Sequence, residues 1–527
     1  MEKFIVGILI IAQLLLSQIQ YIVGKLRTPE GFYYLGSVHW PSDYFYYLSQ
    51  FIQGREHWLS STMLYTSEVL KPVFVGWQHV LAGKILLTLG FDVITSYQIA
   101  VVGFLAFFLI VSYRLLRELL PESKFKRILA FVFFLTATPF LKIIKTPSGW
   151  DISYYWWWYN LGISVSRFGP TPHHLLAYGL GALQLLNLTW WLKKKYSQGR
   201  LSVVMVVVSL LLASISPIHW GLTVISSIGI PVALFIKKGK QRVMVLPRIF
   251  FPAFMIIAGG IPSALYALHV FSIPPYDLSA AWERGQYVYI NLWQLLQGNG
   301  LVVPFALIGL IPIVKQPRRW YLPTFIYLTF AAIMYISTIP KALSLANVRF
   351  WPSTVYVGIS FLAVEGVWWL SKEGKRKIIM VLLLLIYVVS LIPSYFAIYR
   401  DVLKSEVGNA YYYIPIDAYK GYKEAEKVSK SGDVFLVQWP FNESFPALTG
   451  RKSLFGFELF TINHGEKMRD AFSIIDGKLD QQQARRVIDR YGVDYVMVYT
   501  NNEYVRKLPL LKAIYQNNFF TLYQVIR

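Results

Sequence analysis

The sequence has 527 residues, of which 55% are hydrophobic and 17% aromatic, while only 15% are charged and none is cysteine. Soluble proteins are usually about 25% charged, so this composition argues against a soluble enzyme, a disordered chain or a disulfide-linked scaffold. The lack of cysteine also excludes thiol catalysis and cysteine-ligated metals. Because the apolar residues form long runs, we expect an α-helical polytopic membrane protein.

The net charge of +23 lies mainly in the part of the chain that contains these apolar runs. Residues 1–398 carry a net charge of +20, whereas residues 399–527 carry +3. On a soluble protein such a basic excess would suggest nucleic acid binding. Here it indicates membrane topology, so we expect the lipid bilayer as a partner and no nucleic acid.

Eleven apolar stretches have lengths near the roughly 20 residues that a helical crossing needs. They are residues 4–23, 94–113, 128–145, 174–192, 201–218, 219–236, 249–271, 300–314, 321–339, 351–370 and 378–398. Five of the connecting segments are strongly basic, namely 114–127, 193–200, 237–248, 315–319 and 372–377. Lys and Arg are retained in the cytoplasm, so all five should lie there.

The five basic segments share one side only if residues 73–90 do not cross the membrane. We therefore expect residues 73–90 to form a helix on or in the outer membrane surface. The N-terminus is then cytoplasmic in a multi-pass protein of the cytoplasmic membrane, and residues 24–93 form a long first outer loop.

The chain changes character after the last apolar stretch. Residues 1–398 are predicted to be a transmembrane domain, and residues 399–527 a small extracytoplasmic α/β domain. Within the latter, predicted strands are 433–439, 493–499 and 519–526, and predicted helices are 417–430 and 480–491.

Carboxylates on the outer side of the membrane domain are the candidates for a general base. Eight occur there, namely Glu30, Asp43, Glu56, Glu68, Asp92, Asp151, Asp277 and Glu283. Asp43 is the strongest candidate, because it lies among aromatic residues at 39–51, where partial desolvation raises its basicity. Aromatic faces also suit the C–H surfaces of sugars. The alternative is that Asp43 caps a helix beginning at Tyr44, and both roles are compatible.

Several features follow one another along the first 117 residues. An anchoring span precedes Asp43 and its aromatic neighbours, then comes the step Lys71-Pro72 before an apolar helix, and a span ends in Tyr113-Arg114-Leu115-Leu116-Arg117. This succession resembles the type-C membrane glycosyltransferases, relatives of the protein O-mannosyltransferases and the aminoarabinose transferase of lipid A. The resemblance implies many transmembrane helices, an outward-facing active site and often an outer C-terminal domain. It also implies a polyprenyl-phosphate-linked sugar donor and a glycan, lipid or protein acceptor.

By this resemblance, Asp43 matches the catalytic carboxylate of the family. It would accept the proton of the acceptor hydroxyl or orient that hydroxyl, while the sugar carbon inverts and the lipid phosphate leaves. Lys71 matches the basic residue that binds the leaving phosphate. Many members carry a second acid beside the first, whereas Tyr44 follows Asp43 here. This departure does not support a divalent metal, and we expect no cofactor.

Cations on the outer side are also few, and Arg349 stands out among them at the mouth of a span. A guanidinium there can clamp a phosphate with two hydrogen bonds. The alternative is an interfacial arginine directed to lipid head groups. Asp151 precedes the aromatic residues 154–159 and is a candidate polar contact of a sugar or polyprenyl platform. The alternative for that stretch is an interfacial aromatic belt.

Substrate binding is further predicted for His39, Trp40, Tyr44 and Glu68. A zinc site at His173-His174 is not expected, because adjacent residues point apart on a helix and no third His or Cys has ligand spacing. The sequence contains no Gly-rich phosphate loop, GxSxG or HExxH motif, so a nucleotide-dependent mechanism lacks its usual signature. A donor that diffuses in the bilayer needs none of these motifs.

Two other functions stay open at this point. One is a transporter or flippase of lipid-linked sugars, although neither inverted repeats nor charged mid-span helices are clear in the sequence. The other is a non-catalytic subunit of cell-envelope assembly. The replacement Asp43→Asn should abolish glycosyl transfer but leave a scaffolding role intact.

Overall fold

The computed structural model describes residues 1–37, 40–169, 171–238, 246–371, 376–404 and 408–527. They form two compact units, each assembled from separate stretches of the chain. Unit 1 comprises Met1–Ser17, Val101–Leu268 and Glu283–Val402, and unit 2 comprises Gln18–Ala100, His269–Trp282 and Leu403–Arg527. Unit 2 therefore contains all described residues of the first predicted outer loop and most of the C-terminal region. The predicted domain boundary at residue 398 stays a prediction.

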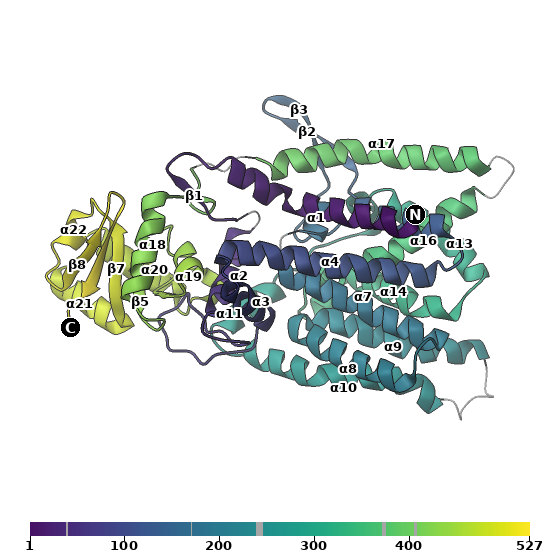
Figure 1. Cartoon of the computed structure of the whole chain (residues 1–527), viewed down its shortest axis with the longest axis horizontal. Coiled ribbons are helices and arrows are strands. Elements are labelled where there is room, and N and C mark those ends of the chain that lie inside the picture. Colours follow the sequence, from purple (N-terminus) through teal and green to yellow (C-terminus); the bar gives the residue numbers. More distant parts are fainter. Residues whose placement is uncertain (38–39, 170, 239–245, 372–375, 405–407) are drawn as a thin grey trace. The chain divides into compact units, whose positions relative to one another are not determined.

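Long apolar helices dominate unit 1 (Figure 1). Among the described residues, seven helices are long and apolar enough to cross a membrane. They are α1 (Glu2–Leu26), α4 (Val93–Leu119), α7 (Pro172–Lys193), α8 (Gln198–Ile215), α9 (Pro217–Lys238), α10 (Leu246–Val270) and α17 (Arg376–Val402). Each corresponds to one of the eleven predicted spans, which confirms a multi-pass membrane protein.

The remaining four predicted spans correspond to shorter helices. Helices α12 (Leu292–Asn299) and α13 (Val302–Lys315) meet at 111° and make an eighth candidate span if they count as one. The others are α5 (Lys124–Thr136), α14 (Leu322–Ile336) and α16 (Val355–Leu370). Helices α13 and α16 pack closely, since a Cβ on Gly366 would lie 2.0 Å from the Phe305 carbonyl oxygen. Small residues allow such close approach between membrane helices.

The predicted span over residues 128–145 is wrong in its second half. Helix α5 ends at Thr136, three residues before Pro139, and a proline disfavours helical backbone at and before its position. Strand β2 (Leu141–Thr146) then pairs antiparallel with β3 (Gly149–Tyr154). The β-branched residues of this segment favour a pleated strand once the helix has ended.

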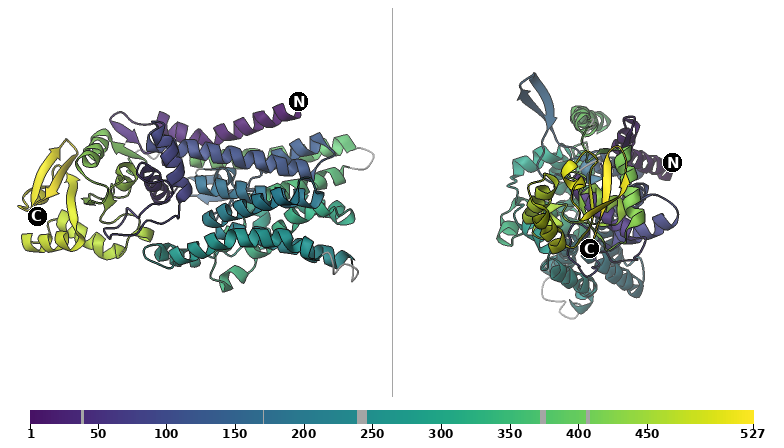
Figure 2. Two further views of the ribbon diagram at one scale, coloured as in Figure 1. Left: turned by 60° about the horizontal axis from the view of Figure 1, so that its bottom comes forward. Right: turned by 90° about the vertical axis from the view of Figure 1, so that its left-hand side faces the viewer.

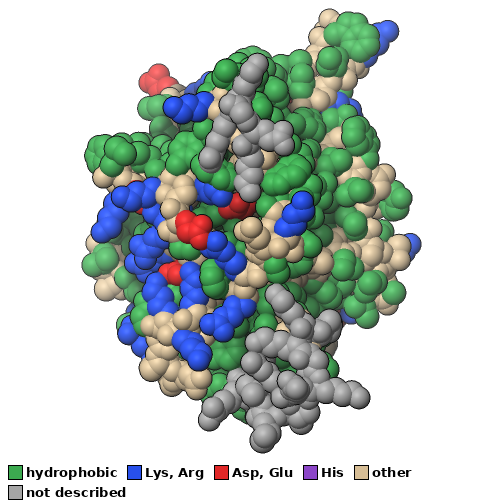
Figure 3. All heavy atoms as spheres, turned by 90° about the vertical axis from the view of Figure 1, so that its right-hand side faces the viewer, with side chains coloured by type: hydrophobic (Ala, Val, Ile, Leu, Met, Phe, Trp, Pro, Cys, Tyr) green, Lys and Arg blue, Asp and Glu red, His purple; other side chains and the backbone are tan. Residues whose placement is uncertain are grey.

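Basic side chains gather at one end of the unit 1 helices (Figure 3). Ion pairs tie together the segments on which they lie, namely Lys193–Glu118, Lys195–Glu118, Arg318–Glu122 and Arg127–Glu2. Three of the five basic segments, 114–127, 193–200 and 315–319, are thus brought to the same end. The other two, 237–248 and 372–377, lie largely outside the described residues.

In unit 2, the first-loop residues form α2 (Pro41–Gln53) and α3 (Trp77–Thr88). Helix α3 confirms the helix predicted within 73–90. A Cβ on Gly83 of α3 would lie only 2.1 Å from the Phe51 carbonyl oxygen of α2, so this glycine permits the close packing of the two helices. Strand β1 (Phe32–Tyr34) pairs antiparallel with β4 (Tyr413–Pro415) and joins this region to the C-terminal region.

The C-terminal region forms a mixed five-stranded sheet of order β6-β5-β7-β9-β8. Its strands are β5 (Val434–Val437), β6 (Lys452–Ser453), β7 (Val493–Tyr499), β8 (Leu511–Gln516) and β9 (Phe520–Val525). Its helices are α18 (Ile416–Val428), α19 (Ser444–Thr449), α20 (His464–Ile475), α21 (Gln481–Tyr491) and α22 (Glu503–Arg506). All three predicted strands and both predicted helices are present, and the predicted small α/β region is confirmed.

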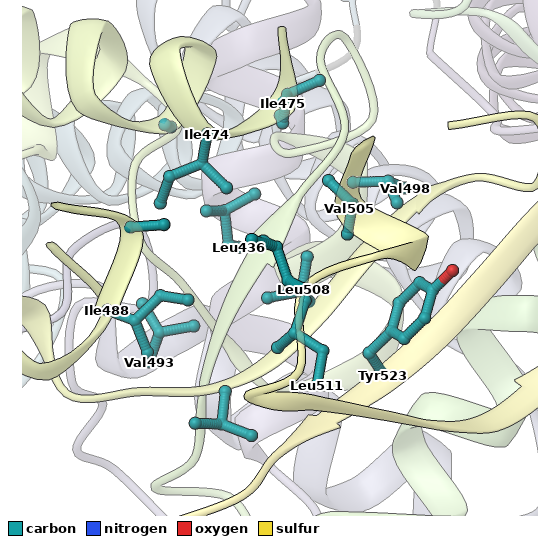
Figure 4. Close-up of a cluster of buried hydrophobic side chains, with 14 of the residues drawn as sticks. Leu436, Ile474, Ile475, Ile488, Val493, Val498, Val505, Leu508, Leu511 and Tyr523 are labelled. Atoms are coloured by element: carbon teal, nitrogen blue, oxygen red, sulfur yellow. The ribbon is translucent and has the colours of Figure 1, made fainter. Parts of the chain in front are cut away.

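The sheet and helices enclose a buried apolar core (Figure 4). Leu436 of β5 and Val498 of β7 meet Ile474 of α20 and Ile488 of α21 there. A capping box begins α21, in which the Asp480 side chain accepts from the Gln483 backbone N–H. Strands β6 and β8 were not predicted, because β6 has only two residues and β8 has an uneven alternation of burial.

The remaining elements are short connections. They are α6 (Ser164–Arg167), α11 (Tyr276–Arg284), α15 (Ile339–Ala342) and the 3₁₀ helices η2 (Arg319–Tyr321), η3 (Asn347–Phe350) and η4 (Glu458–Phe460). Two of them matter for the candidate site, since η3 carries Arg349 and the end of α11 carries Glu283.

Candidate functional site

Asp43 lies in the first turn of α2. The helix begins at Pro41, whose ring suits the first helical position, and its N-cap residue is Trp40, with a left-handed φ of 43°. The predicted role of Asp43 as a cap of a helix beginning at Tyr44 is therefore wrong. A carboxylate in the first turn instead interacts favourably with the positive end of the helix dipole.

Aromatic residues of α2 follow Asp43 directly in the chain. Tyr46 is buried, stacks on Phe460 with ring centres 4.1 Å apart and accepts a hydrogen bond from Gln50 at 3.0 Å. Burial raises the pKa of Tyr46 well above its ordinary value, and the negative charge of nearby Asp43 adds to this rise. The hydroxyl of Tyr44 donates to the Leu35 carbonyl oxygen at 2.8 Å.

The predicted substrate contacts around Asp43 differ in accessibility. Tyr44 is buried in the core of unit 2, where it packs against Tyr97, while Trp40 is half-buried. His39 lies outside the described residues. Substrate binding by these residues stays a prediction.

Glu443 is a second carboxyl group near Asp43, and sequence reasoning missed it. It directly precedes α19, which packs against α2. Its Oε1 accepts from the Tyr411 hydroxyl at 3.4 Å. Ser42, the neighbour of Asp43 in the chain, acts against the effect of burial on the pKa of this carboxyl group. The buried Oε2 has no hydrogen-bond partner among the described residues.

Burial raises the pKa of Glu443 above its ordinary value, and the charges of Glu458 and Asp43 add to the rise. A low-dielectric site with two neighbouring carboxyl groups tends to keep one protonated and the other ionised. Asp43 and Glu443 thus form a pair of neighbouring carboxyl groups, one of which has a raised pKa. The only signal in the sequence was an acid inside the apolar stretch 441–448, and its pairing with α2 required the tertiary structure.

Arg349 lies in unit 1, on η3. Its Nε and one terminal nitrogen donate to the two carboxylate oxygens of Glu283 at 2.8 and 2.9 Å. The guanidinium lies 4.3 Å from the ring centre of Tyr159 and 5.2 Å from that of Trp158. The guanidinium that is predicted to bind a phosphate thus lies against two residues of the aromatic stretch 154–159. Two of its nitrogens already donate hydrogen bonds to a carboxylate.

The Tyr159 hydroxyl extends this cluster towards α7. It hydrogen-bonds with the Tyr178 hydroxyl at 2.8 Å and with His174 Nδ1 at 3.3 Å. His219 of α9 packs against Tyr178 with ring centres 5.5 Å apart, and its buried Nδ1 has no partner among the described residues. Unit 1 therefore contains a polar and aromatic cluster at Arg349.

Three other predicted site residues differ in their surroundings: two form ion pairs and one is exposed. Asp151 lies on β3, and its carboxylate accepts from Arg400 at 2.6 Å. Glu68 accepts from Lys467 at 2.8 and 2.7 Å. Lys71 is exposed. Asp43, Glu68 and Lys71 belong to unit 2, whereas Arg349 and Asp151 belong to unit 1.

Metal binding finds no support among the described residues, where no group of three or more His, Asp or Glu side chains could hold an ion. The expectation that the protein needs no cofactor stays a prediction.

No protein-family model and no curated protein matches the sequence. Solved structures do match it. The crystal structure of ArnT from Cupriavidus metallidurans, bound to undecaprenyl phosphate, aligns with a TM-score of 0.52 at 11% identity, over 98% of this chain and 97% of that one. The apo crystal structure of the Archaeoglobus fulgidus oligosaccharyltransferase aligns with a TM-score of 0.51 at 12% identity, over 93% of this chain and 69% of that one. Both are polytopic membrane glycosyltransferases of type C. The chain therefore has the type-C glycosyltransferase fold, as its sequence predicts.

Proposed function

We propose that the protein is an inverting glycosyltransferase, which moves a sugar from a polyprenyl-phosphate carrier to a glycan, lipid or protein outside the cytoplasmic membrane. The observation that carries the proposal is the placement of Asp43 near a second carboxyl group, that of the partly buried Glu443, in a chain with the type-C fold. The carrier class is supported by the ArnT structure, which has undecaprenyl phosphate bound.

In this mechanism, Asp43 accepts the proton of the acceptor hydroxyl. The hydroxyl oxygen forms a bond to the anomeric carbon of the sugar. The bond from that carbon to the lipid phosphate breaks, its electron pair leaves with the phosphate, and the configuration inverts. Burial raises the pKa of Glu443 above its ordinary value. Asp43, in the first turn of α2, is therefore assigned as the base.

Binding of the lipid phosphate is proposed for Arg349 and, separately, for Lys71. Arg349 holds Glu283 through two parallel N–H donors, and the same geometry fits two oxygens of a phosphate. Phosphate binding then requires Glu283 to release the guanidinium. Replacing Glu283 by Gln removes a competing negative charge and should tighten donor binding.

The proposed topology places the N-terminus in the cytoplasm and residues 24–93 and 399–527 outside. It is supported by the three basic segments that share one end of unit 1. Because the chain has no cysteine, single Cys variants can be tested with an impermeant thiol reagent in intact cells. Asn501→Cys should react and Ser197→Cys should not, whereas the reverse pattern would contradict the topology.

The central experiment measures glycosyl transfer by the purified protein from a panel of polyprenyl-phosphate sugars. General base catalysis contributes about 10²–10⁴-fold, so Asp43→Asn should lower turnover by roughly that factor. Asp92→Asn is the matched control, because Asp92 caps α4 through hydrogen bonds to the backbone of Ile94 and Thr95 and Asn caps a helix equally well. Full turnover by Asp43→Asn would contradict the assignment of the base. Gradient-dependent movement of lipid-linked sugar without transfer would favour the transporter.

A further inference from the structure

The β2–β3 hairpin projects from the helices of unit 1 beside α17 (Figures 1 and 2). Successive side chains of a strand point to opposite faces. In this register Ile143 pairs with Ile152 and Lys145 with Trp150, so these four side chains share one face. Ile143 is 65% exposed and Trp150 75% exposed. An isolated two-stranded hairpin is only marginally stable in water, and this one presents its largest apolar side chains outward.

The opposite face of the hairpin is attached to the end of a membrane span. Arg400 of α17 donates to the Asp151 carboxylate at 2.6 Å and to the Ile152 carbonyl oxygen at 2.9 Å. Helix α17 ends at Val402, two residues later, and is one of the helices long and apolar enough to cross a membrane. The hairpin is therefore held at the level where a span ends, which is the boundary between hydrocarbon and lipid head groups.

The charge of the hairpin fits an anionic surface. Lys142 and Lys145 are both exposed. Asp151 is the only acidic residue between positions 141 and 154, and it pairs with Arg400, whose guanidinium also pairs with Asp401. Lys142, Lys145 and Arg400 together still outnumber these two carboxylates. Lysine and tryptophan are the residue types that interact with head groups at the membrane boundary.

We propose that the β2–β3 hairpin is an interfacial lipid-binding element, which inserts Ile143 and Trp150 among the head groups of anionic phospholipids. The hairpin cannot insert deeper, into the hydrocarbon core, because the backbone N–H and C=O groups along the outer edges of β2 and β3 would find no hydrogen-bond partners there. The head-group region covers the apolar face and still supplies partners to these edges. The proposal does not depend on glycosyl transfer.

The test uses single Cys variants of the full-length protein, labelled with an environment-sensitive fluorophore in vesicles of phosphatidylcholine and phosphatidylglycerol. Ile143→Cys reports on the apolar face and Ser153→Cys on the opposite one. Val389→Cys, on the exposed side of α17, is the lipid reference, and Asn501→Cys is the aqueous reference. Lipids brominated near the top of the acyl chain and aqueous iodide serve as the two quenchers.

The proposal predicts that the label at 143 is quenched by brominated lipid and protected from iodide, with the label at 153 quenched less by the lipid. Each lysine near an anionic surface changes partitioning by about fivefold. Exchange of Lys142 and Lys145 for Gln should therefore weaken lipid quenching at 143 in anionic vesicles, and much less in phosphatidylcholine alone. Iodide quenching at 143 equal to that at 501 would overturn the proposal. Protection from both quenchers would also overturn it, since the face would then be covered by protein.

Discussion

The ion pair between Glu68 and Lys467 offers a test of whether Glu68 binds substrate, as the sequence predicts, or stabilises unit 2. The Lys467 side chain is fully buried, and its ammonium donates to both carboxylate oxygens of Glu68 and to Thr66 Oγ1 at 2.9 Å. Glu68 retains 34% exposure. Removing only the carboxylate leaves a buried charge without compensation, so Glu68→Gln should destabilise the protein more than replacement of both partners.

The magnitude follows from the burial of the two partners. A hydrogen bond to a charged group contributes about 1.5–3 kcal/mol, whereas an exposed ion pair contributes about 0–1 kcal/mol. Glutamine keeps one acceptor oxygen, and Glu68 is partly solvated. We therefore expect Glu68→Gln to lower the free energy of unfolding by about 2 kcal/mol. In a unit of this size that loss lowers the unfolding midpoint by roughly 4–8 °C. Adding Lys467→Met removes the uncompensated charge and should restore most of the midpoint.

The effect of Glu68→Gln should depend on pH. Burial raises the pKa of Glu68, but hydrogen bonds from Lys467 and Thr66 outweigh it and hold the pKa below its ordinary value of 4.5. Because the folded pKa lies below the unfolded one, the stabilisation by the carboxylate is complete above about pH 4.5 and disappears as the pH falls through the lowered pKa. Wild type and Glu68→Gln should therefore differ at neutral pH and converge in strong acid.

The assay is thermal unfolding in detergent, followed by tryptophan fluorescence, with glycosyl transfer measured on the same samples. If Glu68 has a structural role, the double variant Glu68→Gln/Lys467→Met should regain both the unfolding midpoint and the transfer activity of the wild type. A double variant with the wild-type midpoint but no transfer would instead assign Glu68 to the substrate. An unchanged midpoint in Glu68→Gln alone would refute the energetic reasoning.

Three further predictions concern packing and protonation. Arg167→Ala should lower the free energy of unfolding by at least about 3 kcal/mol, because the fully buried guanidinium donates to four backbone carbonyl groups. The loss is measured as a lower unfolding midpoint. Gly366→Leu should lower the midpoint through steric overlap with α13, whereas Gly103→Leu, with open space around its Cβ position, should leave it nearly unchanged. Glu443→Gln should raise the midpoint relative to wild type at neutral pH but not near pH 4. Burial raises the folded pKa of Glu443, so wild-type stability falls as the pH rises from the ordinary value through the raised one.

Several elements could be predicted from the sequence because their signals are local. Each of the seven long helices follows from an apolar run of sufficient length. Strand β7 and helix α21 follow from alternation and from a capping box, both of which involve neighbours within a few residues. Where two local signals competed, as in residues 128–145, apolar composition predicted a span although Pro139 and the following β-branched residues favour a break and a strand.

The candidate site was predictable only in part. Asp43 was predicted because its aromatic neighbours are adjacent in the chain, and its place at the start of a helix is also a local property. Its partner Glu443 lies 400 positions away, and no periodicity or motif connects the two. The same holds for Arg349, whose carboxylate partner Glu283 is 66 residues earlier.

The sequence by itself determined the membrane class and the seven long helices, and it predicted a common end for the three basic segments that the structure describes. Hydropathy and charge could do so because they act on each segment separately. Only the tertiary structure decided which charges are compensated and which carboxyl groups meet. It tied Glu68 to Lys467 and Asp151 to Arg400, and it brought Glu443 to the first turn of α2. Such pairs depend on how packed elements bring distant residues into a low-dielectric interior, where a charge or a polar atom must find a partner.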